Sequence, residues 1–228
     1  MTVERLVAGT GAGRAAGVRG RQSEGTRELI MATAERLFAE HGLAGVSARQ
    51  ISEAAGQGNN AAVGYHFGTK TDLILAVVRR HNQRIELRRA GMLELLGPDA
   101  GPRDWIECLV RPLTEHLAEP GGPSWYARFS LQVGIDPVLR EILSREARST
   151  PGVVRIAAGL RPSLAALPPE VRRARLEMIR HLIAHTCADR ERALATAARP
   201  VRADWDRTAR LLVDAVAGLL LAPVTSGR

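Results

Sequence analysis

The stretch "SARQISEAAGQGNNAAVGYHFGTKTDL", Ser47–Leu73, decides the fold of this chain. Its first residue is followed three positions later by Gln50, the spacing of a capping box at the start of a helix. Val46 and Ile51 flank that start at the positions of a hydrophobic staple. Gly56 is suited to end the short helix, and the "QGNN" that follows is typical of a turn.

A second short helix is predicted from about Asn60 to His66, where Gly68 breaks it. Thr69 then caps a long helix, with Asp72 at the third helical position completing a second capping box. Two short helices joined by a tight, glycine-containing turn form a helix-turn-helix unit when a third helix supports them.

The supporting helix is predicted from Glu24 to Glu40, with Gly42 as its stop. Its apolar residues recur on one face at helical spacing. They are Ile30, Ala34, Leu37 and Phe38. Residues 1–22 are rich in Gly, Ala and Arg and lack apolar periodicity, so we expect a disordered basic arm.

Beyond residue 97 the pattern changes to longer helices separated by Pro and Gly. The predicted helices are Pro102–Ala118, Pro123–Val133, Pro137–Arg148, Pro151–Leu167, Pro169–Ala198 and Arg202–Leu221. Ala, Leu, Arg and Glu abound, whereas β-branched and aromatic residues are scarce. We therefore predict an all-α protein with a helix-turn-helix domain over residues 23–80 and a larger helical domain over residues 81–228.

The net charge of +8 is unevenly distributed. Residues 1–89 contain thirteen Lys and Arg against eight Asp and Glu, a net +5, and the longer remainder carries only +3. A basic N-terminal third suits a polyanionic partner such as nucleic acid. The alternative is an Arg-rich composition without functional meaning.

Cys108 and Cys187 occur in no CxxC spacing, which favours reduced thiols in a cytoplasmic protein. No run reaches the roughly eighteen apolar residues of a membrane span, and the N-terminus has no sustained apolar segment typical of a secretory signal. We expect no membrane partner, no cofactor and no bound metal.

In a helix-turn-helix unit the first helix braces on the DNA backbone and the second places its N-terminal side chains against base edges. The second helix begins with Asn59, Asn60, Ala61 and Ala62. Asn can pair bidentately with adenine, and Ala methyls can contact thymine methyls. Ser47 at a helix start, together with Arg49, suits phosphate anchoring.

The region from about Thr26 to Val78 closely resembles the N-terminal DNA-binding domain of TetR-type transcriptional regulators. The resemblance rests on the ordered patterns "A-x-x-L-F-x-x-x-G", "V-S-x-R-x-I-x-x-x-A-G" and "Y-H-F-x-x-K-x-x-L". It implies an all-helical homodimer that binds a palindromic operator in double-stranded DNA. It also implies release of that DNA, as by a repressor, when a small-molecule effector enters the C-terminal domain.

By the same resemblance, Tyr65, His66 and Lys70 lie near operator phosphates, while Phe67 packs inside. Thr69, at the start of the long helix that contains Lys70, is a further candidate for DNA binding. Lys70 is the only lysine in the chain. The turn "GQGNNAAVGYHF" is one residue longer than is usual in the family, and Gly64 stands where many relatives carry a Tyr.

The resemblance places the dimer interface on the final two helices, as a four-helix bundle. Near the C-terminus a heptad-like stripe suits a partner helix. It consists of Trp205, Ala209, Leu212, Val216 and Leu219. The alternative is a stripe buried within its own subunit, because periodicity cannot assign the neighbour.

A ligand cavity is expected among the middle helices, lined by apolar and aromatic residues with few polar groups. The candidates are Trp105, Cys108, His116, Trp125, Tyr126, Phe129 and Met178. Each of these residues is also compatible with a plain core position.

His181 and His185 are four residues apart on a helix, the spacing that metal sites use, and Asp189 extends their face. An all-helical metal-dependent protein or enzyme is therefore the alternative function. No nucleophile–base pair, pair of catalytic carboxylates or phosphate loop accompanies these histidines, so we expect a regulator rather than an enzyme.

Overall fold

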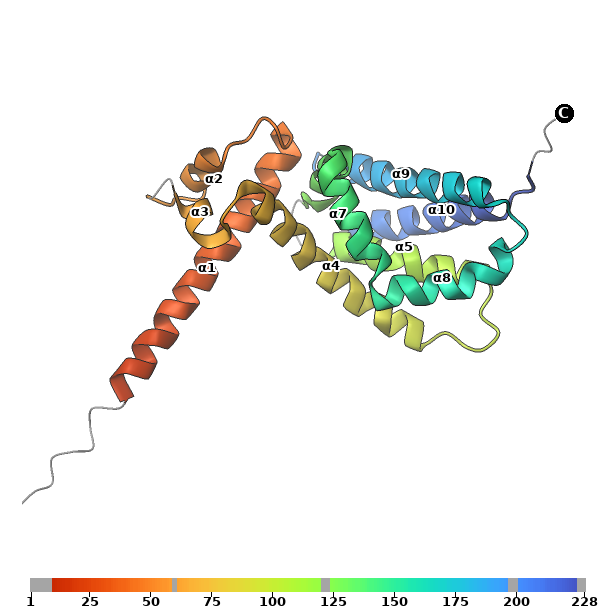
Figure 1. Ribbon diagram of the computed structural model, residues 1–228, viewed down its shortest axis with the longest axis horizontal. Coiled ribbons are helices and arrows are strands. Elements are labelled where there is room, and N and C mark those ends of the chain that lie inside the picture. The colour runs from red at the N-terminus through yellow and green to blue at the C-terminus, as the bar shows by residue number, and fades with distance from the viewer. Residues whose placement is uncertain (1–9, 59–60, 120–123, 197–200, 225–228) are drawn as a thin grey trace, which may run out of the picture.

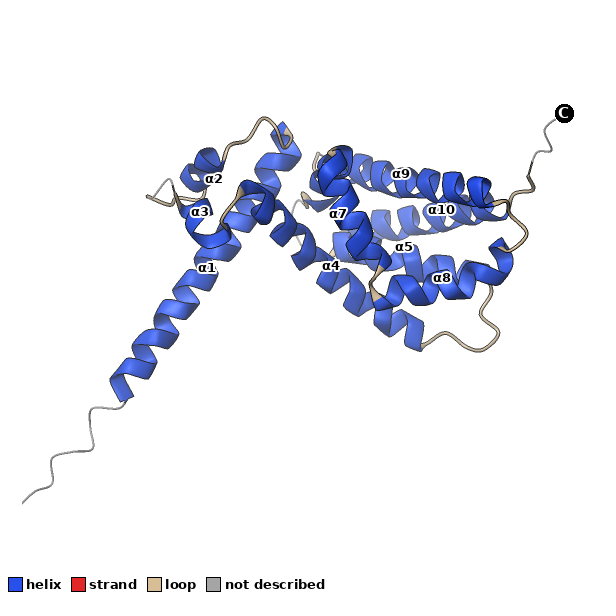
Figure 2. Ribbon diagram, in the orientation of Figure 1, coloured by secondary structure: helices blue, strands red, loops and turns tan. Residues whose placement is uncertain are grey.

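The computed structural model describes residues 10–58, 61–119, 124–196 and 201–224. Within these ranges every regular element is an α-helix, as predicted (Figure 2). The helices are α1 Thr10–His41, α2 Ala48–Ala54, α3 Ala62–Phe67, α4 Lys70–Glu94, α5 Pro102–Ala118, α6 Tyr126–Ile135, α7 Pro137–Arg148, α8 Pro151–Leu164, α9 Pro169–Leu194 and α10 Val201–Leu221.

The first helices form a small N-terminal head. Helices α2 and α3 pack on each other, α2 on α1, and α3 on the start of α4 (Figure 1). The core of the head is fully enclosed. It contains Ile30, Phe38, Ile51, Val63, Leu73 and Val77. The predicted apolar face of α1 is confirmed, with Leu37 half-buried at its edge.

Helices α4–α10 form the larger body (Figure 1). Helix α5 lies at its centre, since it contacts α4, α8 and α10, while α6 packs between α1 and α9. The buried stripe of α4 begins in the head with Leu73 and continues through His81 to Leu93 in the body. Helix α4 therefore belongs to both parts.

Proline explains several boundaries. Pro at the first helical position lacks the amide hydrogen that a helix start leaves unsatisfied, and α5, α7, α8 and α9 each begin at the predicted proline. The ends agree less well: α8 stops at Leu164 and α9 at Leu194. Helix α6 begins at Tyr126, after residues 120–123, which lie outside the described ranges.

The expectation of a disordered arm is wrong for residues 10–22, which form the first turns of α1 (Figure 1). This segment has no apolar face, but it continues directly from a packed helix. Extending a helix costs far less than nucleating one, and Ala and Arg favour the helical backbone.

Candidate functional site

The start of α2 is fixed by the predicted capping box. The Ser47 side chain accepts a hydrogen bond from the backbone N of Gln50 at 3.2 Å, and Oε1 of Gln50 accepts from the backbone N of Ser47 at 2.8 Å. Val46 and Ile51, the predicted staple, are both buried. The exposed Arg49 is the second residue of the helix and pairs with Glu53 at 2.8 Å.

Ser52 joins the two short helices, a role that was not predicted from the sequence. Its hydroxyl is fully buried, donates to the carbonyl oxygen of Ala48 at 3.1 Å and accepts from the backbone N of Val63 at 3.4 Å. Gly56, with φ of +66°, turns the chain between the helices. Because a buried hydroxyl needs partners, these two bonds define how α3 sits on α2.

The predicted base-reading residues divide into three groups. Asn59 and Asn60 lie outside the described residues. Ala61 is exposed. Ala62 is 6% exposed and packs in the core of the head, so its methyl group cannot contact DNA, and that prediction is wrong. Helix α3 begins two residues later than predicted, which turns Ala62 inward.

Tyr65 lies on the surface at the end of α3, with 82% of its area exposed. Its ring meets the His66 ring edge to face, with centroids 5.0 Å apart. The corner behind it is fixed by Arg27, which donates to the carbonyl oxygen of His66 at 2.5 Å and lies 4.1 Å above the ring of Phe67. Phe67 is half-buried against the core.

The helix boundary between α3 and α4 is built as predicted. Gly68 has φ of +84°, and Thr69 and Asp72 form the second capping box. Lys70 differs from prediction, because its ammonium group turns inward and donates to the carbonyl oxygen of Leu43 at 2.5 Å. Burial lowers the pKa of Lys70 below its usual value.

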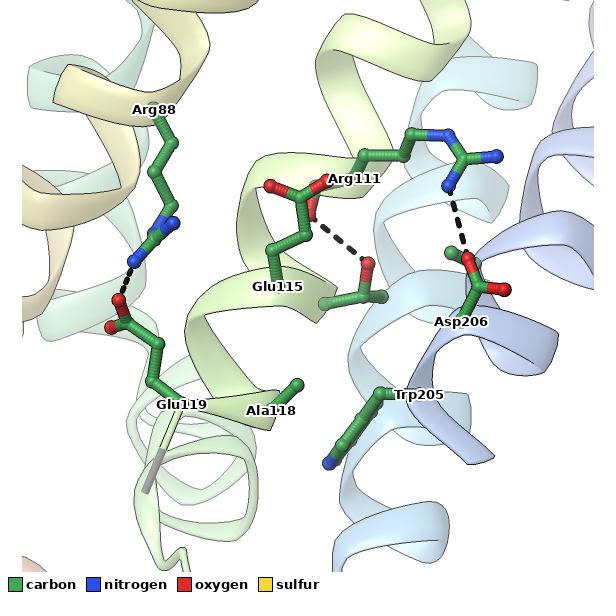
Figure 3. A pocket seen from close by; sticks show the side chains of 9 residues that line it. Arg88, Arg111, Glu115, Ala118, Glu119, Trp205 and Asp206 are labelled. Carbon is green, nitrogen blue, oxygen red and sulfur yellow. Dashed lines mark hydrogen bonds and ion pairs between the residues drawn. The ribbon is translucent and has the colours of Figure 1, made fainter. Parts of the chain in front are cut away.

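Two of the cavities that the described residues of the body form share Glu119 in their lining. The first, about 380 Å³, lies between α4, α5 and α10 (Figure 3). Ion pairs border it: Arg88 with Glu119, and Arg111 with Asp206 at 3.3 Å. None of the predicted ligand residues lines it.

The second cavity, about 330 Å³, lies where α1, α4, α5 and the start of α6 meet. Its lining includes three of the predicted ligand residues, His116, Trp125 and Tyr126. The other lining residues were not predicted from the sequence. They are Glu35, His81, Arg84, Glu119 and Ser124. His81 continues the α4 stripe one turn after Val77, and that spacing could have identified it.

Four predicted ligand residues lie elsewhere, so their assignment is wrong. Trp105 packs over Gly159 of α8 so closely that a Cβ there would lie 2.2 Å from the indole. Cys108 is buried core, and Phe129 is fully buried beside Phe38, with ring centroids 6.0 Å apart. Met178 is 53% exposed on α9.

The α10 stripe predicted for dimerisation is buried in its own subunit instead. Its first four members are at most 2% exposed and pack against α5 and α9, and Leu219 is half-buried. The outer face of α10 presents Leu211, which is 55% exposed, followed by Ala215 and Gly218. The assignment of the stripe to a partner subunit is therefore wrong. The apolar periodicity alone does not identify the helix against which the stripe packs.

His181 and His185 lie exposed on α9, with ring centroids 6.5 Å apart. His181 Nε2 lies 2.6 Å from the guanidinium of Arg180. Among the described residues no group of three or more His, Cys, Asp or Glu side chains could hold a metal ion. No helix in the same ranges is long and apolar enough to cross a membrane.

Two family models match the chain. "Bacterial regulatory proteins, tetR family" matches residues 30–77, and "Tetracyclin repressor-like, C-terminal domain" matches residues 107–218. The first match covers the head from the middle of α1 into α4, and the second covers most of the body.

Curated relatives include the HTH-type transcriptional repressor AcnR of two Corynebacterium species. The chain is 31% identical to the C. glutamicum protein over 118 residues, 50% of this chain and 54% of that one. It is 35% identical to the C. efficiens protein over 133 residues, 54% of this chain and 66% of that one. The matches thus span between about half and two thirds of these relatives.

Two solved structures are also similar. The TetR family transcriptional regulator PfmR from Thermus thermophilus has 18% identity and a TM-score of 0.46, covering 87% of this chain and 96% of that one. A TetR-family transcriptional regulator from Pectobacterium atrosepticum has 22% identity and a TM-score of 0.34, covering 90% of this chain and 98% of that one.

Proposed function

The chain belongs to the TetR family, whose members are DNA-binding transcriptional regulators rather than enzymes, and we propose that it is a cytoplasmic repressor. It binds a palindromic operator as a homodimer and is released by a small molecule that enters its body. The printed names of the Corynebacterium relatives support repression rather than activation.

The observation that carries this proposal is the exposure of Tyr65 on a corner whose backbone is held by Arg27. An aromatic side chain that leaves 82% of its area in water gains little for the fold. Ser47, Arg49, Ala61 and Thr69 are exposed on the same small head. These residues, with Asn59 and Asn60 preceding α3, are the proposed DNA surface.

The proposed contacts differ in kind. Ser47 lies at the start of α2, where backbone amides point outward and favour a phosphate. Arg49 can exchange its exposed bond with Glu53 for a phosphate, because surface ion pairs are weak. Tyr65 and His66 reach the DNA backbone, while Asn59, Asn60 and Ala61, which precede α3, read base edges.

Dimerisation is assigned to the outer faces of α9 and α10. Leu211, Ala215 and Gly218 follow helical spacing on α10, and a Cβ at Gly218 would meet nothing within 4 Å. On α9, Leu176 and Met178 are also about half exposed. Small residues beside exposed leucines allow two helices to approach closely, and a two-fold axis would repeat the contact.

The 330 Å³ cavity is the proposed effector site, because it joins the helix α1 of the head to α4, α5 and α6 of the body. Operator binding requires the two α3 helices to lie about 34–36 Å apart, one turn of DNA. A ligand that binds better to a wider or rotated dimer lowers operator affinity by its differential affinity for the two states.

Selection of bound fragments from random double-stranded DNA tests the proposal. The expected product is a palindrome with half-sites about one helical turn apart, bound by two chains. The logarithm of the affinity should fall linearly with the logarithm of salt concentration as phosphate contacts release counterions. Recovery of no palindrome, or binding by a single chain, would contradict the proposed function.

A further inference from the structure

Three buried side chains connect the effector cavity to the head. Nε2 of His81 lies 2.8 Å from Oε2 of Glu35, and Nδ1 of His81 lies 2.7 Å from Nε2 of His116. All three residues are at most 8% exposed. Glu35 belongs to α1, His81 to α4 and His116 to α5, so one hydrogen-bonded chain spans three helices.

The hydrogen-bonded chain of Glu35, His81 and His116 lacks a partner at its His116 end. Nδ1 of His116 is buried and has no hydrogen-bond partner among the described residues, although Oε2 of Glu119 lies 3.5 Å away. A buried polar atom without a partner is costly. Because His116 lines the 330 Å³ cavity, a molecule bound there can supply the missing partner.

The charges around the cavity are unequally satisfied. Glu35 is held by Arg80 at 2.9 Å as well as by His81, and Glu119 pairs with Arg88. Arg84 also lines the cavity, and no carboxylate among the described residues pairs with it. Arg84 is therefore the charged side chain of this lining that is left to pair with a ligand.

We propose that the effector is a small aromatic carboxylate, held by Arg84 and by Nδ1–H of His116 beside the rings of Trp125 and Tyr126. This inference rests on the proposed function and names the ligand class of the same site. A guanidinium recognises a carboxylate through charge-assisted hydrogen bonds. A cavity of 330 Å³ is at the small end of ligand pockets, which suits a single-ring acid.

The proton positions explain how such a ligand is sensed in the head. A carboxylate only accepts hydrogen bonds, so a bound ligand requires a proton on Nδ1 of His116. Burial, followed by the neighbouring His81, lowers the pKa of His116 to about 4, so this ring stays neutral and its Nε2 is then an acceptor.

His81 must in turn donate from Nδ1 to His116. Its Nε2 donates to Glu35, the nearer partner at 2.8 Å, although the Nη2 of Arg80 also lies 3.4 Å from it. With a ligand bound, the four ring nitrogens of His81 and His116 therefore carry three protons, and His81 carries the positive charge. Its bond to the Glu35 carboxylate then joins two opposite charges, which strengthens the contact. The Tyr126 ring, stacked on His81 at 3.9 Å, keeps this imidazole in place. Ligand binding is thus coupled to proton uptake and to the α1–α4 contact.

Calorimetric titration of the full-length protein with sodium benzoate, without DNA, tests this inference. Benzoate is expected to bind once per chain, and the neutral isostere benzamide about tenfold or more weakly, because it has no negative charge to pair with Arg84. Titrations in two buffers of different ionisation enthalpy should show net uptake of up to one proton per chain. In spectra of ¹⁵N-histidine protein, Nδ1 of His116 should become protonated on binding.

Arg84→Gln removes the exposed guanidinium without disturbing the core, and it should weaken benzoate about tenfold. Arg161→Gln, an equally exposed change on α8, should leave the affinity unchanged. Equal affinities for benzoate and benzamide, wild-type affinity in Arg84→Gln, or the absence of proton uptake would each overturn the inference. A chain that binds its operator but not benzoate refutes only this ligand class. One that binds benzoate but no operator refutes only the proposed function.

Discussion

The ammonium group of Lys70 donates a hydrogen bond to the carbonyl oxygen of Leu43, which precedes it by 27 residues. The bond joins the first residue of α4 to the turn between α1 and α2, and the ammonium lies 5.6 Å from the ring centre of Phe38. The only lysine of the chain therefore stabilises the head, whatever it contributes to DNA binding.

Lys70→Met keeps the apolar stem and removes the charge, and we expect it to lower the free energy of unfolding by about 1–2 kcal/mol. Urea denaturation of the purified protein measures this. Arg49→Met, an exposed change on α2, should alter stability by less than about 0.5 kcal/mol. If Lys70→Met is as stable as wild type but binds the operator weakly, the lysine acts on DNA alone.

Tyr65→Ala should leave the stability within about 0.5 kcal/mol of wild type, since surface substitutions away from packed features are nearly neutral. Its affinity for the selected operator, measured by fluorescence anisotropy, should fall about tenfold. Leu95→Ala is the matched control, because Leu95 is 87% exposed but lies at the far end of α4. A Tyr65→Ala protein with wild-type operator affinity removes this residue from the DNA surface.

Leu211→Arg should yield a folded monomer, because it places a charge in the proposed dimer contact without touching the core. Light scattering after size exclusion gives the mass. Val154→Arg, at a residue of similar exposure on α8, should remain dimeric. Leu212→Ala, one residue along, should instead cost about 2–5 kcal/mol of stability through a core cavity. A dimeric Leu211→Arg protein would place the interface elsewhere.

Stability should fall on acidification because of His116. Its pKa is lowered to about 4 in the folded protein from an ordinary value near 6.5, so the unfolded chain binds more protons between these values. The contribution is present above about pH 6.5 and is lost as the pH falls towards 4, amounting to about 2 kcal/mol between pH 7 and pH 5.

Urea midpoints measured across that pH range test this expectation. His116→Phe keeps an aromatic ring but removes the titrating group. It should flatten the profile by the same amount, even if the variant is less stable at pH 7. His181→Phe, at an exposed histidine, should not change the slope. An unchanged profile in His116→Phe would mean that another group titrates.

The sequence predicted those features whose causes are local. Capping at Ser47 and Thr69 and the proline starts of α5 and α7 depend on neighbouring residues, and the structure has them where they were expected. The helix-favouring composition and the family resemblance were also sufficient to predict the all-α architecture.

Features that depend on distant partners were not predicted. The bond between Glu35 and His81 joins residues 46 positions apart, and no local pattern marks it. The heptad spacing on α10 was correct, but its neighbours are α5 and α9 of the same chain. Ala62 was misassigned because a shift of α3 by two residues turns a surface position into a core position.

Helix α4 has 25 residues and contains no proline, so it behaves as one rod about 37 Å long. Its first turn carries the head, and its far half forms a wall of the body. A tilt of 10° at one end displaces the other by about 6 Å over that length. A small movement of the body, transmitted by such a lever, is enough to put the two heads of a dimer out of phase with successive grooves.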